Sequence, residues 1–253
     1  MSGEHVSLLR HTLGSRWLLL AFAAIFILAA YVRFADLGGP AFLVDEMYHV
    51  YAAKGILEGR GPVFESGDPY RRAVEVTWLV AASFAWLGES EYSARLPSVL
   101  VSIAFLIVST IWVRREFGAL TAAIYALFLG LAPFEVMVGR MVRMYPLFQA
   151  LFCASAVALY YALERKPGTS ANPSLGERLA RSTGVNAGFL IVGLILLHLS
   201  NRLHALTGTI AVAMLCYALF CALMSCLRLL PESSRWGGRY TIYLALILLA
   251  PLV

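Results

Sequence analysis

Two adjacent carboxylates, Asp45 and Glu46, are the residues of this chain best suited to chemistry. They follow a long apolar segment, and an ionised carboxylate enters hydrocarbon only at a large free-energy cost. We therefore expect both to face water, headgroups or a ligand at a membrane surface. Asp45 is suited to act as a general base, and Glu46 to orient the acceptor or to tune the pKa of its neighbour. The simpler alternative is that Asp45 is the N-cap of a helix.

Arginines in three other polar segments are suited to bind an anion. The guanidinium stays charged and matches phosphate oxygens through a planar fork of donors. The expected substrate-binding residues are Arg140, Arg143, Tyr145, Arg71, Arg72, Arg202, His204 and His49. Arg140 and Arg143 are spaced to converge on one anion if the segment is helical. The alternatives are arginines that extend to lipid headgroups and, for His49, a solvated helix face.

Neither a metal nor a cofactor is assigned. Asp45, Glu46 and His49 can bind a divalent cation in principle, but they lack a compact set of ligands around them. The four cysteines lie in apolar runs without metal-ligand spacing, so we interpret them as buried free thiols.

The composition is that of an integral membrane protein, with 60% hydrophobic and 14% charged residues. About seven segments approach or exceed the length needed to span a bilayer. They are 17–35, 96–113, 119–139, 145–163, 185–200, 205–230 and 240–253. The expected fold is an all-α, polytopic transmembrane bundle forming one domain over 1–253. The net charge of +5 is spread along the chain, which favours an orientation signal and no nucleic-acid partner.

Segment 73–87 decides the topology. At about 1.5 Å per residue it is shorter than a hydrocarbon core of about 30 Å, and it contains Glu75. If it does not span, more than half of the basic residues lie on the inner side, as the positive-inside rule prefers. Residues 36–95 then form an external loop with amphipathic surface helices near 45–57 and 73–87. Residues 164–184 become a cytoplasmic connector.

Several ordered motifs resemble the GT-C glycosyltransferases, nearest to the protein O-mannosyltransferase and lipid A aminoarabinose transferase branches. They are Val44-Asp45-Glu46-Met47-Tyr48, Leu87-Gly88, Ser93-Ala94-Arg95-Leu96-Pro97-Ser98, Arg114-Arg115-Glu116-Phe117-Gly118 and Arg140-Met141-Val142-Arg143-Met144-Tyr145. The resemblance implies inverting transfer of a sugar from a polyprenyl phosphate to an acceptor hydroxyl. It places the acid-base work on the Asp-Glu pair, and the lipid phosphate on external arginines, at the outer face of a bacterial inner membrane.

The chain departs from that family in two respects. Many members have His-Pro-Pro or Lys-Pro before the second surface helix, where this chain has Asp68-Pro69-Tyr70-Arg71-Arg72, which leaves the acceptor open. The family is also longer, so the chain resembles its N-terminal portion. Two other classes stay open: a transporter or flippase of lipid-linked sugars, and a non-catalytic membrane subunit. A transporter is expected to have charges or Gly/Pro breaks at mid-membrane depth. Pro133 and Glu135 are the residues that come closest to this pattern.

Overall fold

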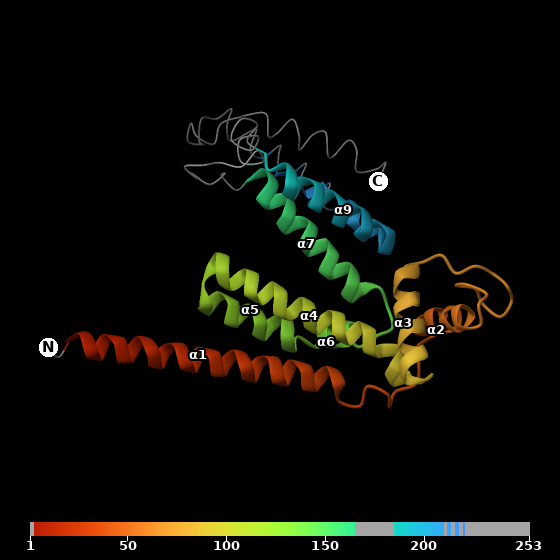
Figure 1. Ribbon diagram of the computed structural model, residues 1–253, viewed down its shortest axis with the longest axis horizontal. Coiled ribbons are helices and arrows are strands. Elements are labelled where there is room, and N and C mark those ends of the chain that lie inside the picture. The colour runs from red at the N-terminus through yellow and green to blue at the C-terminus, as the bar shows by residue number, and fades with distance from the viewer. Residues whose placement is uncertain (1–2, 165–184, 210–211, 214–215, 218–219, 221–253) are drawn as a thin grey trace. The chain divides into compact units, whose positions relative to one another are not determined.

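The computed structural model describes residues 3–164, 185–209, 212–213, 216–217 and 220 (Figure 1). This part of the chain is all-helical, as the composition predicts. Its elements are α1 (Gly3–Phe34), α2 (Val44–Leu57), α3 (Val74–Leu87), α4 (Glu91–Phe117), α5 (Ala119–Leu131), α6 (Pro133–Gly139), α7 (Tyr145–Leu163), α9 (Ala187–Leu203) and the 3₁₀ turn η1 (Ala205–Thr207). The chain divides into two compact units, 1–147 and 148–253, and α1 to α6 belong to the first.

Three of these helices are long and apolar enough to cross a membrane: α1 over Trp17–Phe34, α4, and α7. Together α5 and α6 also meet this test, but they are bent by 60° at their junction. The helices identify the chain as a membrane protein. α3 has 14 residues and thus a length of about 21 Å, less than the hydrocarbon thickness. The predicted connector 164–184 and the spans 205–230 and 240–253 lie largely outside the described residues.

The bend between α5 and α6 is caused by a proline and stabilised by an arginine from α1. Pro133 has no N–H group to bond the carbonyl of Leu129, so the helix breaks there. The buried guanidinium of Arg33, on α1, donates instead to the carbonyl oxygens of Leu129 at 3.2 Å and Gly130 at 2.6 Å. It also donates to Ser102 Oγ on α4 at 3.0 Å. One arginine therefore joins α1, α4 and the bent pair.

Helices cover both stretches of the first loop in which surface helices are predicted, with bounds close to those expected. Val50 and Ala53 of α2 pack on Val80, Ala81 and Phe84 of α3 in a common hydrophobic core. This burial makes the loop a folded element, and the first turn of α2 carries the predicted acids.

A short hairpin over 62–70 leads from α2 to α3. Val63 and Pro69 form an isolated antiparallel bridge. Phe64 N donates to Asp68 O at 3.0 Å, and Tyr70 N donates to Pro62 O at 2.8 Å. Gly67, at φ 88°, makes the turn in a backbone region that favours glycine. These bonds hold the aromatic residues of the hairpin in place beside α2.

Candidate functional site

Asp45 lies in the first turn of α2, and its side chain is 61% exposed. The N-cap of this helix is Leu43, so the alternative assignment of Asp45 as the N-cap is wrong. A carboxylate in the first turn still interacts favourably with the positive end of the helix dipole. Asp45 is therefore an accessible carboxylate on a helix.

Arg143 is the cation beside this carboxylate. Its Nη2 lies 3.4 Å from Asp45 Oδ2, and its Nη1 donates to the Asp45 carbonyl oxygen at 3.2 Å. The guanidinium also lies over the ring of Tyr145, 5.5 Å from the centroid. The Arg143 side chain is only 8% exposed, and its buried Nε has no partner among the described residues. Arg143 thus combines a buried charge with an unused donor next to Asp45.

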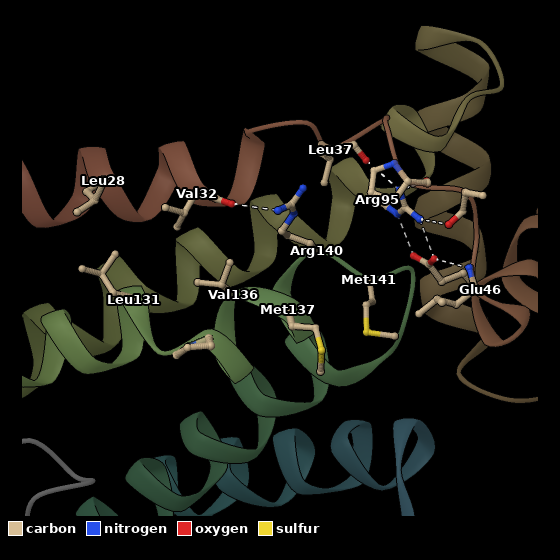
Figure 2. Close-up of a pocket in the computed structure, with 14 residues that line it drawn as sticks. Leu28, Val32, Leu37, Glu46, Arg95, Leu131, Val136, Met137, Arg140 and Met141 are labelled. Atoms are coloured by element: carbon tan, nitrogen blue, oxygen red, sulfur yellow. Dashed lines mark hydrogen bonds and ion pairs between the residues drawn. The ribbon is translucent and has the colours of Figure 1, made fainter.

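Glu46 differs from its neighbour because it is completely buried. Figure 2 shows its carboxylate facing Arg95, whose Nε and Nη2 donate to it at 3.0 and 2.9 Å. The backbone N–H groups of Leu43 and Val142 each donate to it at 2.9 Å. Burial alone would raise the pKa of Glu46, but these bonds and the Arg95 charge hold it below its ordinary value. Glu46 is therefore an ionised positioning group and not the catalytic residue that the sequence predicts, because its oxygens are already occupied.

Arg95, for which the sequence predicts no role, secures the loop between α1 and α2. Its Nη1 donates to the carbonyl oxygens of Leu37 at 3.0 Å and Pro40 at 2.7 Å. Its Nη2 donates to the carbonyl oxygen of Ala41 at 3.1 Å. All its nitrogens are engaged, so Arg95 is a structural partner of Glu46 and not an anion receptor. In the sequence, Arg95 stands two residues before Pro97 of the same helix, and nothing in this pattern indicates a partner in another segment.

Arg140 contacts the C-terminal end of α1 and the loop that follows it. Its Nη1 donates to the carbonyl oxygen of Val32 at 3.4 Å (Figure 2). Its Nη2 donates to the carbonyl oxygens of Ala35 at 2.6 Å and Asp36 at 3.1 Å, which lie just beyond the end of α1. Arg143 instead contacts Asp45. The two arginines do not converge, so the joint anion site expected from their spacing is not formed. The break after α6 explains this, since residues 140–144 are not helical.

His49 is fully buried between α2 and α3. Its Nδ1 lies 2.9 Å from Thr77 Oγ1, and its Nε2 lies 3.4 Å from the hydroxyl of Tyr70. Burial lowers its pKa to about 4, and the charges of Arg143 and Arg72 act in the same direction. His49 is therefore neutral at physiological pH, and the alternative of a solvated helix face is wrong. Among the described residues, no group of three or more His, Cys, Asp or Glu side chains is arranged to hold a metal.

An aromatic cluster next to Asp45 was not predicted. The rings of Tyr48, Phe64 and Tyr70 have centroids 5.5 to 6.4 Å apart, and Tyr48 and Tyr70 are nearly parallel. Burial raises the pKa of the Tyr70 hydroxyl, and Asp45 contributes to the rise although Arg143 and Arg72 oppose it. Tyr48 is on α2, whereas Phe64 and Tyr70 are in the hairpin, so no periodic pattern in the sequence indicated that the three rings meet.

The remaining predicted residues lie at the start of α3 and in the second unit. Arg71 and Arg72 are exposed where the hairpin meets α3, and the Arg72 charge reaches His49 and Tyr70. Arg202 and His204 belong to the second unit. There, Arg202 is exposed in the last turn of α9, and His204 Nδ1 accepts from Leu206 N at 3.1 Å.

An open cavity of about 730 Å³ adjoins the buried pair. Figure 2 shows apolar side chains of α1 and of the bent pair along it, with Leu28 and Leu131 at one end and Glu46 and Arg95 at the other. Because Leu28 and Val32 belong to a candidate membrane span, this cavity joins an apolar surface to the polar start of α2.

Comparison of the chain with protein-family models, with curated proteins and with solved structures found no match.

Proposed function

We propose that the chain is a membrane glycosyltransferase that moves a sugar from a polyprenyl phosphate to an acceptor hydroxyl. In this proposal it is a multi-pass protein of the bacterial inner membrane, with α2 and α3 at the outer surface. The observation that carries the proposal is the exposed Asp45 carboxylate held beside the buried Arg143 guanidinium. A base and a fixed cation side by side are what this reaction requires.

The proposed step is a single displacement at the anomeric carbon. Asp45 takes the proton of the acceptor hydroxyl while that oxygen forms a bond to the anomeric carbon. The bond from this carbon to the phosphate oxygen breaks on the opposite face, and the phosphate leaves with the electron pair. Arg143 stabilises the charge that develops on the phosphate. The configuration is inverted, and one carboxylate is enough because phosphate needs no protonation to leave.

The cavity beside Glu46 supports a lipid-linked donor. Its apolar end is formed by residues of candidate membrane helices, whereas its other end lies one residue from Asp45 in the sequence. A polyprenyl chain in this cavity would keep its apolar body in contact with hydrocarbon-facing side chains. Its phosphate would then lie at the level where α2 begins.

A transporter or flippase of lipid-linked sugars is the second candidate. The observation in its favour is the 60° break at Pro133 with the buried Arg33 beside it, because broken helices and buried charges are typical of transport pathways. The two functions differ in what Asp45 does, since transport needs no base at that position.

Replacing Asp45 by Asn tests the proposal. We expect Asp45→Asn to lower sugar transfer from a radiolabelled undecaprenyl-phosphate sugar by at least about 100-fold, the scale of losing a general base. Glu65→Gln, an exposed acid of the same loop, is the matched control and should transfer normally. Normal turnover in Asp45→Asn would exclude Asp45 as the base. Lipid-linked sugar translocation without transfer in the unaltered protein would favour the transporter.

A further inference from the structure

We propose that the acceptor at this site is a carbohydrate, which lies with one face of its ring on the aromatic platform formed by Tyr48, Phe64 and Tyr70. The inference rests on the proposed function and specifies its acceptor. Sugar rings present C–H groups to the electron-rich face of an aromatic ring, and their hydroxyls bond to nearby carboxylates. The site combines both kinds of group.

The platform and the base share one side of α2. Tyr48 follows Asp45 by three residues, the spacing that places two side chains next to each other on a helix. Tyr48 is 45% exposed, and the Asp45 side chain is 61% exposed. An acceptor that binds at Asp45 therefore has Tyr48 beside it. Tyr48 would contact the ring of the acceptor, and Asp45 would bind its reacting hydroxyl.

The platform is preorganised. The hairpin bonds from Phe64 to Asp68 and from Tyr70 to Pro62 hold two of its rings, and α2 holds the third. The hydroxyl of Tyr70 is further positioned by His49, whose imidazole is locked by Thr77. A surface held in this way loses little conformational entropy when a ligand binds.

The surroundings distinguish the platform from a membrane anchor. Aromatic anchors lie among apolar side chains at the interface, as the exposed Trp78 and Trp86 do on the apolar helix α3. The loop around the cluster is instead polar: Arg60 pairs with Glu58 just before the hairpin, and within it Ser66 donates to Asp68 at 2.8 Å. Tyr48 is exposed, and Phe64 and Tyr70 are half-buried, so part of the cluster is open to water and can receive a soluble or headgroup-level sugar.

The same loop is poorly suited to hold a peptide acceptor. Extended peptides are commonly bound by the free edge of a strand, through backbone hydrogen bonds. In the hairpin, the N–H groups of Phe64 and Tyr70 already bond within the turn, and Pro69 has none. A ring face beside a carboxylate favours a sugar.

Acceptor kinetics with altered platform residues test the inference. The protein in membranes is supplied with saturating undecaprenyl-phosphate mannose, glucose or arabinose, and with either methyl glycosides or acetylated Ser/Thr peptides as acceptors. We expect transfer to glycosides, and a rise of about tenfold in acceptor KM for Tyr48→Ala with little change in kcat. Tyr48→Phe keeps the ring and should stay close to the unaltered protein. Tyr51→Ala, an exposed tyrosine of α2 outside the platform, is the control.

A binding measurement separates this inference from the proposed function. Saturation-transfer NMR on the detergent-solubilised protein with methyl glycosides needs no turnover. Binding that disappears in Tyr48→Ala but persists in Tyr51→Ala supports the platform even if no donor is used, in which case only the proposed function fails. Absence of glycoside binding, equal behaviour of the two Ala variants, or transfer to peptides alone would overturn the carbohydrate assignment.

Discussion

Asp45 and Glu46 are adjacent in sequence but differ in every property that matters for chemistry. Asp45 is accessible and contacts Arg143, whereas Glu46 is enclosed and bonded to Arg95 and to two backbone N–H groups. A helix turns its side chains by about 100° per residue, so neighbours face different surroundings. The acidic pair therefore divides into one candidate base and one positioning group.

At the residue scale, we predict that Glu46→Gln destabilises the protein by about 3 to 5 kcal/mol, because it leaves the Arg95 charge buried without its partner. Glu46→Gln combined with Arg95→Met should recover part of this loss, since the unbalanced charge is removed. Thermal unfolding in detergent measures both. Additive effects of the two substitutions would show that the pair is not coupled.

The same pair has a defined pH dependence. The pKa of Glu46 is lowered in the folded state, so its stabilising contribution is complete above the ordinary Glu pKa and is lost as the pH falls through the lowered value. The difference in unfolding temperature between the unaltered protein and Glu46→Gln should therefore shrink on acidification. A difference that stays constant from neutral to acidic pH would contradict this.

At the scale of elements, the bend between α5 and α6 determines where the segment 140–144 begins. Arg33 bonds the carbonyl that Pro133 leaves without an N–H partner, and the close approach of Gly139 to Ser102 fixes the end of α6 against α4. A Cβ atom added at Gly139 would lie 2.9 Å from Ser102 Oγ. The bend is thus held from both sides, and Arg140 and Arg143 follow directly after it.

Arg33 and Pro133 should therefore be coupled. We expect Arg33→Met to destabilise the protein by about 1 to 3 kcal/mol, the cost of leaving buried carbonyl oxygens without donors. Pro133→Ala should be better tolerated in that background than alone, because the new N–H group can bond Leu129 O. Unfolding temperatures of the four proteins in this cycle measure the coupling, with Arg115→Met on exposed α4 surface as control. Equal effects of Pro133→Ala in both backgrounds would show that Arg33 and Pro133 are not coupled.

At the scale of the whole molecule, the first unit combines candidate membrane helices, an apolar cavity and a polar site. If the cavity holds the donor chain, a larger side chain in it should impair long donors selectively. We expect Val136→Trp to raise KM about tenfold for an undecaprenyl-linked sugar, and to leave a short, water-soluble prenyl donor unaffected. Phe134→Trp, exposed outside the cavity, is the control. Equal effects on long and short donors would place the chain elsewhere.

The amino-acid sequence by itself determined the membrane class and the approximate positions of the described helices, and it singled out Asp45 as a candidate base. These follow from hydropathy, from helix length and from the cost of burying charge, all of which depend on residues close together in the chain. Segment 119–139 was expected to be a single span, and only the structure shows that Pro133 divides it into α5 and α6.

Only the tertiary structure decided which charged residues meet. Glu46 and Arg95 are 49 positions apart, and Arg140 contacts carbonyl oxygens more than 100 positions earlier. Spacing within one segment carries no information about such partners, so Arg140 and Arg143 were grouped although they point to different places. The platform of Tyr48, Phe64 and Tyr70 arises in the same way, because a hairpin turn returns two rings to the helix that carries the third.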